Sequence, residues 1–153
     1  MFILLLAALA APAVGPGSIA EWVSVQTEDA KPTGTIVYSR TFELDFEPEQ
    51  AWLKYTVYTS ADFAGTTYRS FVNNIQGPGG TFWMDTQYTA LPGVLHKGTN
   101  AVEIEVAWVK NGVPGPMLMR LYAKGRDEDG AEKTIDIRSD SSWTYRQGEH
   151  RPL

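Results

Sequence analysis

Two glutamates spaced two positions apart, Glu103 and Glu105, are the first candidates for chemistry in this sequence. Glycoside hydrolysis needs two carboxyl groups held about 5–10 Å apart, and residues two positions apart share one face of a β-strand. The same alternation is typical of the solvated face of a half-buried sheet, which we favour. Ser139–Ser142 has neither a G-x-S-x-G motif nor a nearby histidine. The sequence therefore predicts a protein that is not an enzyme.

Metal ligands are sparse. The chain has no cysteine, and its two histidines, His96 and His150, lie far apart in the sequence. The acidic stretch Asp127–Gly130 has oxygen ligands that calcium accepts but lacks the further acidic positions of an EF-hand loop. A solvated hairpin turn explains the same residues and is favoured. We expect no cofactor and no metal site, with a structural calcium ion as the alternative.

A third group of residues fits sugar recognition. An aromatic ring can stack on the apolar face of a pyranose, while planar amide, guanidinium and carboxylate groups bond its hydroxyls. Such residues surround the glycine-rich stretch Gly77–Gly80, which we expect to be a mobile loop. The alternative for the large aromatics is a place in the core, since tryptophan is usually buried. We predict a carbohydrate site in loops at one end of the fold, formed by Asp62, Arg69, Asn73, Asn74, Trp83 and Tyr88.

The composition is that of one folded, acidic domain. The chain has 153 residues, of which 43% are hydrophobic and 12% aromatic, and this excludes extensive disorder. With 18 acidic and 13 basic residues its net charge is −5, so it lacks the basic surface that nucleic-acid binding requires. The absence of cysteine excludes a disulfide framework and a thiol nucleophile.

The first residues form an apolar segment that we interpret as a secretory signal. Phe2–Ala11 is too short to span a membrane but fits the apolar region of a signal peptide, and small residues follow it. We expect residues 1–17 to be this segment and residues 18–153 to be a single domain, secreted and without membrane contact once the signal is removed. The alternative is an apolar arm that packs on the domain or on another copy.

The remainder alternates with a period of two between turn residues, which is typical of an antiparallel β-sandwich. No window after residue 20 shows a long helical stripe. Parity assigns Trp108 to the core, whereas it places Trp52 and Tyr58 on an outward aromatic patch. The predicted strands are Thr35–Leu44, Ala51–Thr59, Tyr68–Ile75, Asp85–Thr89, Ala101–Val109, Met117–Lys124 and Thr134–Arg138.

Several stretches resemble the galactose-binding-like β-sandwich modules of secreted glycoside hydrolases, such as α-L-rhamnosidases and β-galactosidases. They occur in the order expected of such modules and together cover about residues 36–145. This resemblance implies an all-β fold, an antiparallel jelly-roll β-sandwich. The matching stretches are Tyr38–Leu44, Ala51–Leu53, Tyr68–Asn74, Leu95–Ile104 and Ser139–Trp143. The resemblance also implies that Trp143 lies in the core.

The sequence also departs from these modules. Asn74 replaces the glycine of their V-N-G motif, which requires a left-handed backbone or another kind of turn. The chain ends about ten residues after Trp143, where such enzymes continue into a catalytic domain. The resemblance therefore implies the module and not the glycosidase activity.

We interpret the chain as a secreted, non-catalytic, lectin-like carbohydrate-binding module whose partner is a glycan. The alternative is a structural protein that assembles with copies of itself into an extracellular filament or surface layer, through the apolar segment or the face carrying Trp52 and Tyr58. A weaker alternative is a glycoside hydrolase or a fragment of one.

Overall fold

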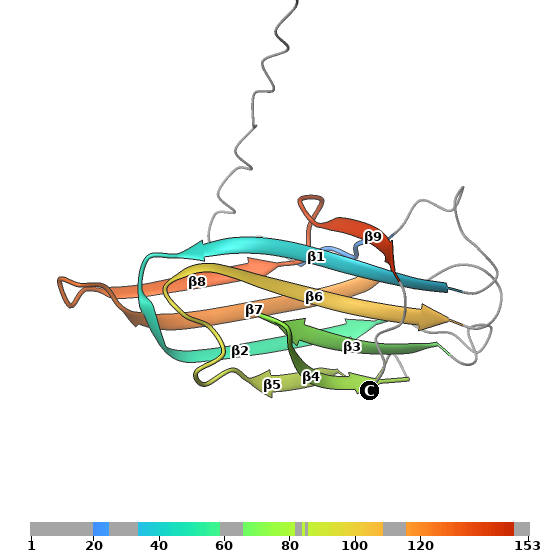
Figure 1. The fold of residues 1–153 in the computed structure, drawn as a ribbon, viewed down its shortest axis with the longest axis horizontal. Coiled ribbons are helices and arrows are strands. Elements are labelled where there is room, and N and C mark those ends of the chain that lie inside the picture. Colours follow the sequence, from blue (N-terminus) through green and yellow to red (C-terminus); the bar gives the residue numbers. More distant parts are fainter. Residues whose placement is uncertain are drawn as a thin grey trace, which may run out of the picture.

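The computed structural model describes residues 20–24, 34–58, 66–81, 84, 86–108 and 116–148. Over these residues two antiparallel sheets lie face to face as a β-sandwich, with the strands running along its long axis (Figure 1). This part of the chain has no helix that is long and apolar enough to cross a membrane. The predicted signal segment, residues 1–17, lies outside the described residues.

The first sheet has five strands in the order β4-β3-β6-β1-β9. Its centre is the long pair β1 and β6, which stay in register along their full length. The strands are β1 (Gly34–Leu44), β3 (Thr67–Val72), β4 (Ile75–Gly80), β6 (Gly98–Trp108) and β9 (Thr144–Gly148).

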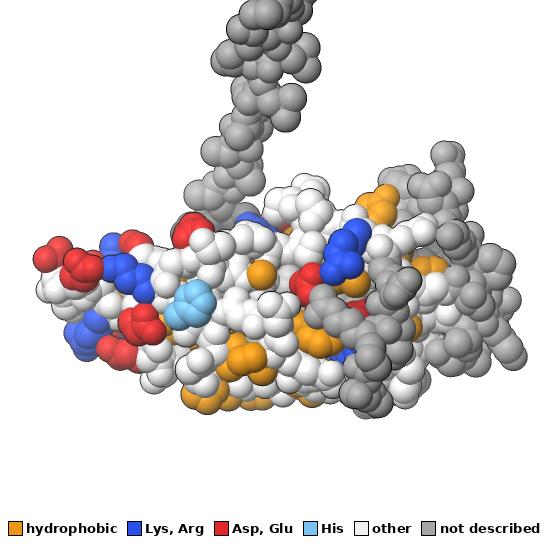
Figure 2. All heavy atoms as spheres, viewed as in Figure 1, with side chains coloured by type: hydrophobic (Ala, Val, Ile, Leu, Met, Phe, Trp, Pro, Cys, Tyr) orange, Lys and Arg blue, Asp and Glu red, His pale blue; other side chains and the backbone are white. Residues whose placement is uncertain are grey.

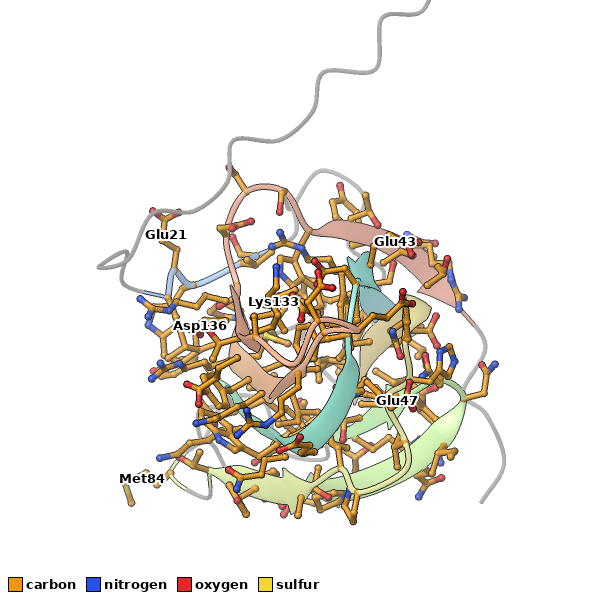
Figure 3. The ribbon with its side chains drawn as sticks, turned by 90° about the vertical axis from the view of Figure 1, so that its left-hand side faces the viewer. Glu21, Glu43, Glu47, Met84, Lys133 and Asp136 are labelled. Atoms are coloured by element: carbon orange, nitrogen blue, oxygen red, sulfur yellow. The ribbon has the colours of Figure 1, made fainter. Side chains whose placement is uncertain are left out.

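The second sheet has four strands in the order β5-β2-β7-β8. Viewed from the end, side chains fill the space between the sheets, whereas Glu43 and Asp136 project on opposite sides of the sandwich (Figure 3). The strands are β2 (Glu47–Val57), β5 (Gln87–Ala90), β7 (Met117–Arg126) and β8 (Glu132–Arg138).

Alternate residues of both sheets form the core, as the sequence pattern predicts. Ile104 on β6 and Leu53 on β2 are fully buried, and both belong to one hydrophobic cluster between the sheets. Trp108 and Trp143 join this cluster with 4% and 6% of their surface exposed, which confirms their assignment. The predicted fold class, an all-β sandwich, is confirmed.

The turn after β3 corrects the predicted strand Tyr68–Ile75, which was wrong in its extent. Asn73 and Asn74 adopt φ angles of 49° and 65°, as both central residues of a tight type I′ hairpin turn do. Asparagine tolerates this left-handed conformation, so the chain reverses here without a glycine. The following Gly77–Gly80 stretch is then part of strand β4, and the prediction of a loop there was also wrong.

Strand β4 lies close to the opposite sheet at the edge of the sandwich. The Tyr55 hydroxyl on β2 donates a hydrogen bond to the Pro78 carbonyl on β4. The Tyr55 ring also packs edge-on against that of Tyr68, with centroids 5.9 Å apart. Burial raises the pKa of Tyr55 well above its usual value, so the phenol stays a neutral donor. This contact joins the two sheets directly beside the groove described below.

Candidate functional site

A groove opens on the outer face of the five-stranded sheet, over β3, β4 and the end of β6. Its volume is about 390 Å³, which lies within the usual range for a small-ligand site, about 300–1,000 Å³. Most of the side chains around it carry hydrogen-bonding groups. The lining residues are Thr67, Tyr68, Arg69, Gln76, Gly79, Gly80, Thr81 and Glu105.

A buried ion pair is part of this lining. Arg69 on β3 and Glu105 on β6 are register partners, and only 6% and 1% of their surfaces are exposed. The Arg69 Nε and a terminal guanidinium nitrogen both lie 2.9 Å from Glu105 Oε1. Parity places both side chains on the outer face, but the predicted solvated position of Glu105 is wrong because the arginine and its neighbours cover it.

Two further contacts fix the orientation of the Arg69 guanidinium. It lies 5.2 Å from the centre of the Phe71 ring, which flanks it on the same strand. It also donates to the Gln76 Oε1 atom on β4 at 3.4 Å. The groove therefore presents a charged pair that is held in place before any ligand arrives, together with the amide of Gln76.

The glycines of β4 keep one wall of the groove low. A Cβ atom at Gly79 would lie 2.4 Å from the Tyr68 carbonyl oxygen, and one at Gly80 would lie 2.7 Å from the Tyr68 hydroxyl. Side chains at these positions would force β4 away from β3. The glycine-rich stretch thus has a packing role, and it leaves backbone and small polar groups at the groove surface.

The structure does not bring together the predicted site residues that it describes. Asn73 lies in the β3–β4 turn, where its amide nitrogen donates to the Val94 carbonyl and to Asn100 Oδ1, both at 2.8 Å. Its side-chain oxygen accepts from the Ala101 backbone N–H. The amide of Asn73 therefore joins the turn to the loop before β6. Asn74 is exposed beside it, in the left-handed conformation described above.

Tyr88 lies on the opposite side of the molecule. It is on β5 and pairs in register with Lys54 of β2, so it projects from the outer face of the four-stranded sheet, with 61% of its surface exposed. Asp62 and Trp83 lie outside the described residues. Of the four predicted residues that the structure describes, Arg69 alone lines the groove. Trp83 follows the groove residue Thr81 by two positions in the sequence.

Neither a family model nor a curated protein matches the chain, but solved structures do. An α-L-rhamnosidase from Streptomyces avermitilis, complexed with L-rhamnose, superposes on 88% of this chain with a TM-score of 0.59 and 20% identity. A lectin from Pleurotus ostreatus, in complex with GalNAc, covers 84% with a TM-score of 0.61 and 18% identity. An Aspergillus terreus α-L-rhamnosidase covers 80% with a TM-score of 0.56 and 20% identity.

This chain corresponds to only part of each of those proteins. It spans 12% of the Streptomyces rhamnosidase, 35% of the lectin and 16% of the Aspergillus rhamnosidase. The resemblance to rhamnosidase modules noted in the sequence is thereby confirmed at the level of the fold.

The carboxylates that the sequence offers for catalysis are already engaged. Glu105 accepts both hydrogen bonds from Arg69, and the Glu103 Oε1 atom accepts from Arg146 of β9 at 3.1 Å. Both carboxylates are therefore held by arginine side chains from strands of the same sheet.

The acidic turn Asp127–Gly130 between β7 and β8 has the features of a hairpin turn. The Asp127 Oδ1 atom accepts from the backbone N–H of Ala131 at 2.8 Å, and this bond holds the pKa of Asp127 below its usual value. Glu128 forms an ion pair with Lys97. Among the described residues no group of three or more His, Cys, Asp or Glu side chains is arranged to hold a metal ion. Charged side chains gather at this end of the molecule (Figure 2).

Proposed function

We propose that this chain is a secreted, non-catalytic carbohydrate-binding module that holds a neutral sugar in the groove over β3, β4 and β6. The observation that carries the proposal is the groove itself, a sugar-sized hollow lined by hydroxyl, amide and guanidinium groups around a buried ion pair. The fold adds support, because solved structures that share it include a lectin in complex with GalNAc and a rhamnosidase complexed with L-rhamnose.

Each part of the groove has a distinct role in this proposal. The amide of Gln76 and the hydroxyls of Thr67 and Thr81 line the groove and bond sugar hydroxyls, since each can donate and accept. The Arg69–Glu105 pair supplies fixed charge that polarises those hydrogen bonds. The expectation from the sequence that Trp83 stacks on the apolar face of a sugar ring stays a prediction, since Trp83 lies outside the described residues.

Binding without catalysis is consistent with the state of the two glutamates. Glu103 and Glu105 both accept hydrogen bonds from arginines, so both carboxylates already have partners within the sheet. Purified protein should not turn over aryl rhamnosides or galactosides. Sustained turnover that is lost in Glu103→Gln or Glu105→Gln would contradict this part of the proposal.

A glycan array is the test, run once with calcium and once with a chelator so that it also addresses structural calcium. The best neutral ligand is then titrated by calorimetry into Gln76→Ala, and into Gln50→Ala as the matched control. Gln50 is also exposed on a strand, but it lies on β2 of the other sheet. Loss of one hydrogen bond should weaken binding about twofold to tenfold in Gln76→Ala alone. No ligand on the array, or equal affinities in both variants, would contradict the proposal.

Self-assembly remains a second candidate because of one exposed aromatic pair. Trp22 and Tyr58 meet edge-on with centroids 6.4 Å apart, and 48% and 39% of their surfaces are exposed. Such a pair could pack against another copy. Size-exclusion chromatography with light scattering distinguishes the two functions: a monomer across the accessible concentration range favours the binding module, and a concentration-dependent larger species favours assembly.

A further inference from the structure

The outer face of the four-stranded sheet carries an aromatic cluster, on the side of the sandwich opposite to the groove. Trp52 on β2 and Tyr122 on β7 are register partners, and their rings stack with centroids 5.6 Å apart. Tyr88 on β5 adds a third ring, 6.3 Å from that of Trp52. The Trp52 and Tyr122 rings pack against each other, whereas the ring of Tyr88 is exposed to solvent.

A row of cationic side chains crosses the sheet directly beside these rings. Lys54 of β2 pairs in register with Tyr88 on one side and with Arg120 of β7 on the other. Arg120 pairs in turn with Arg138 of β8. Because register partners in adjacent strands point to the same face, the three cations and the tyrosine form one continuous row. Arg120 also lies over the Trp52 ring at 5.5 Å.

Among the described residues, one carboxylate forms ion pairs with this row. Arg120 bonds Asp136 through two nitrogens at 2.8 and 3.0 Å, and Arg138 bonds the same carboxylate at 3.1 and 2.5 Å. Within the described part of the chain the Lys54 ammonium has no carboxylate within ion-pair distance. Three cations against one carboxylate leave an excess of positive charge, on a protein whose net charge is −5.

The other cations of this face are paired individually. Lys124 forms an ion pair with Glu132 at 2.7 Å, and Arg126 forms one with Glu49 at 3.6 Å. The positive excess is therefore confined to the row beside the aromatic cluster. Positive charge and exposed aromatic surface at one place together match a ligand that is both anionic and partly apolar.

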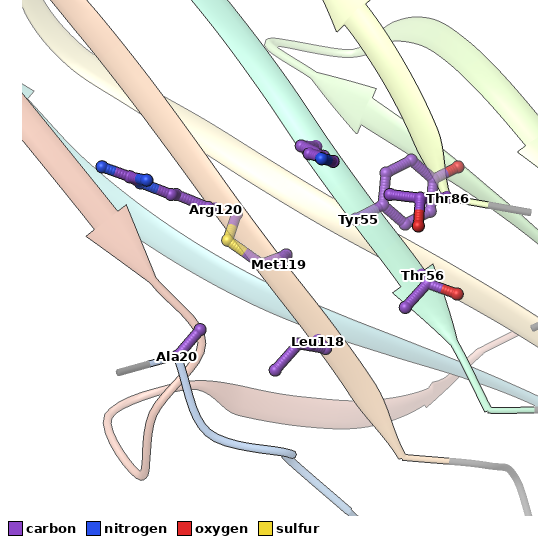
Figure 4. A pocket seen from close by; sticks show the side chains of 8 residues that line it. Ala20, Tyr55, Thr56, Thr86, Leu118, Met119 and Arg120 are labelled. Carbon is purple, nitrogen blue, oxygen red and sulfur yellow. The ribbon is translucent and has the colours of Figure 1, made fainter. Parts of the chain in front are cut away.

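A shallow hollow of about 200 Å³ adjoins the row, between β2, β7 and the segment that contains Ala20 (Figure 4). This volume is below the usual range for a complete ligand site, so it fits one group of a longer ligand. Its lining is Ala20, Lys54, Tyr55, Thr56, Thr86, Leu118, Met119 and Arg120.

We propose that this face binds an acidic polysaccharide, with a hexuronate carboxylate at Lys54 and Arg120 and a sugar ring against Tyr88. The Lys54 ammonium attracts the ligand carboxylate, and Arg120, which already bonds Asp136 through two nitrogens, adds positive charge beside it. The exposed tyrosine ring offers the surface on which a pyranose stacks. An extended chain can follow the row across the sheet, placing one sugar unit beside the hollow. This site is separate from the groove, and it extends the proposed function from a neutral sugar to an acidic glycan.

The test compares a galacturonate tetramer with its fully methyl-esterified form, which keeps the sugar and removes the charge. Both are titrated by calorimetry into the full chain and three variants, Lys54→Ala, Tyr88→Ala and Lys97→Ala. The last is the matched control, because it removes the same charge from an exposed lysine in the loop before β6. Melting temperatures confirm that each variant is folded.

The acidic tetramer should bind at least about tenfold more tightly than its ester, and Lys54→Ala should remove about that factor, the equivalent of one charged hydrogen bond. Tyr88→Ala should weaken both ligands, and Lys97→Ala neither. No binding of the acidic tetramer, equal affinity for the ester, or equal losses in Lys54→Ala and Lys97→Ala overturns the proposal. Neutral-sugar binding that depends on Gln76 is measured separately, so either site can fail without the other.

Discussion

Removing one partner of the Arg69–Glu105 pair should destabilise the protein far more than removing both. Glu105→Leu leaves the Arg69 guanidinium, 6% exposed, without the carboxylate that accepts its two 2.9 Å contacts. An uncompensated buried charge costs about 3–5 kcal/mol. A single domain typically has about 5–15 kcal/mol of stability, so this variant should lose a large fraction of it.

The double variant Arg69→Met/Glu105→Leu removes both charges and keeps similar side-chain volume. Replacing a whole buried ion pair by apolar residues is often neutral or stabilising, so we expect the double variant to recover most of the loss. Arg69→Met alone leaves the nearly inaccessible Glu105 carboxylate without its cation and should resemble Glu105→Leu.

Urea unfolding of all four proteins at pH 7, followed by tryptophan fluorescence, supplies the free energies for a double-mutant cycle. We expect a coupling energy of about 2 kcal/mol or more between the two positions. Additive losses, with the double variant least stable, would refute the reasoning, since they would mean that each side chain stabilises the fold independently of the other.

Three further predictions concern other contacts. Tyr55→Phe should lower the free energy of unfolding by about 1–3 kcal/mol at pH 7, because it leaves the Pro78 carbonyl without its donor. Since burial raises the pKa of Tyr55, the contribution of the neutral phenol to wild-type stability should be complete below about pH 10 and be lost above it. In urea titrations the variant should lack this alkaline dependence. Burial of Asp136 is outweighed by hydrogen bonds from two arginines, which lower its pKa. The stability that its ion pairs contribute should therefore be complete above about pH 4 and be lost as the pH falls further. In Asp136→Asn the free energy of unfolding should depend less steeply on pH in this acid range. Gly125→Ala should lower the melting temperature, because the new Cβ would lie 2.2 Å from the Glu47 carbonyl oxygen; an unchanged melting temperature would show that β2 and β7 can separate without cost.

The strands that alternate strongly could be predicted from the sequence, and the weakly patterned ones could not. Strand β6 has a clear apolar face, and parity placed Trp108 in the core correctly. Strand β4 was missed because glycine and proline dominate Gly77–Gly80. The close approach of this stretch to β3, for example of Gly77 to Ser70, explains why residues without side chains are needed there. Strand β9, Thr144–Gly148, was missed because its exposed residues at the sheet edge leave no apolar alternation.

The groove was only partly predictable for a different reason. Arg69 was identified by its chemistry, but its partner Glu105 lies 36 positions along the chain, and only the pairing of β3 with β6 brings them together. Tyr88 was assigned to the same site because it is near in sequence, yet β5 belongs to the other sheet. Asn73 has side-chain chemistry suited to sugars, but its turn uses that amide to hold the loop before β6.

Mapping of the bound sugar by NMR tests the central claim most directly. The ¹⁵N-labelled protein is titrated with the best neutral ligand from the array, and amide shifts are followed residue by residue. The account predicts that the largest shifts fall on the groove, at Thr67, Gln76 and Thr81 and at the side-chain amide of Gln76. Shifts confined to the Asp127–Gly130 end of the sandwich, or no shifts at saturating ligand, would contradict it.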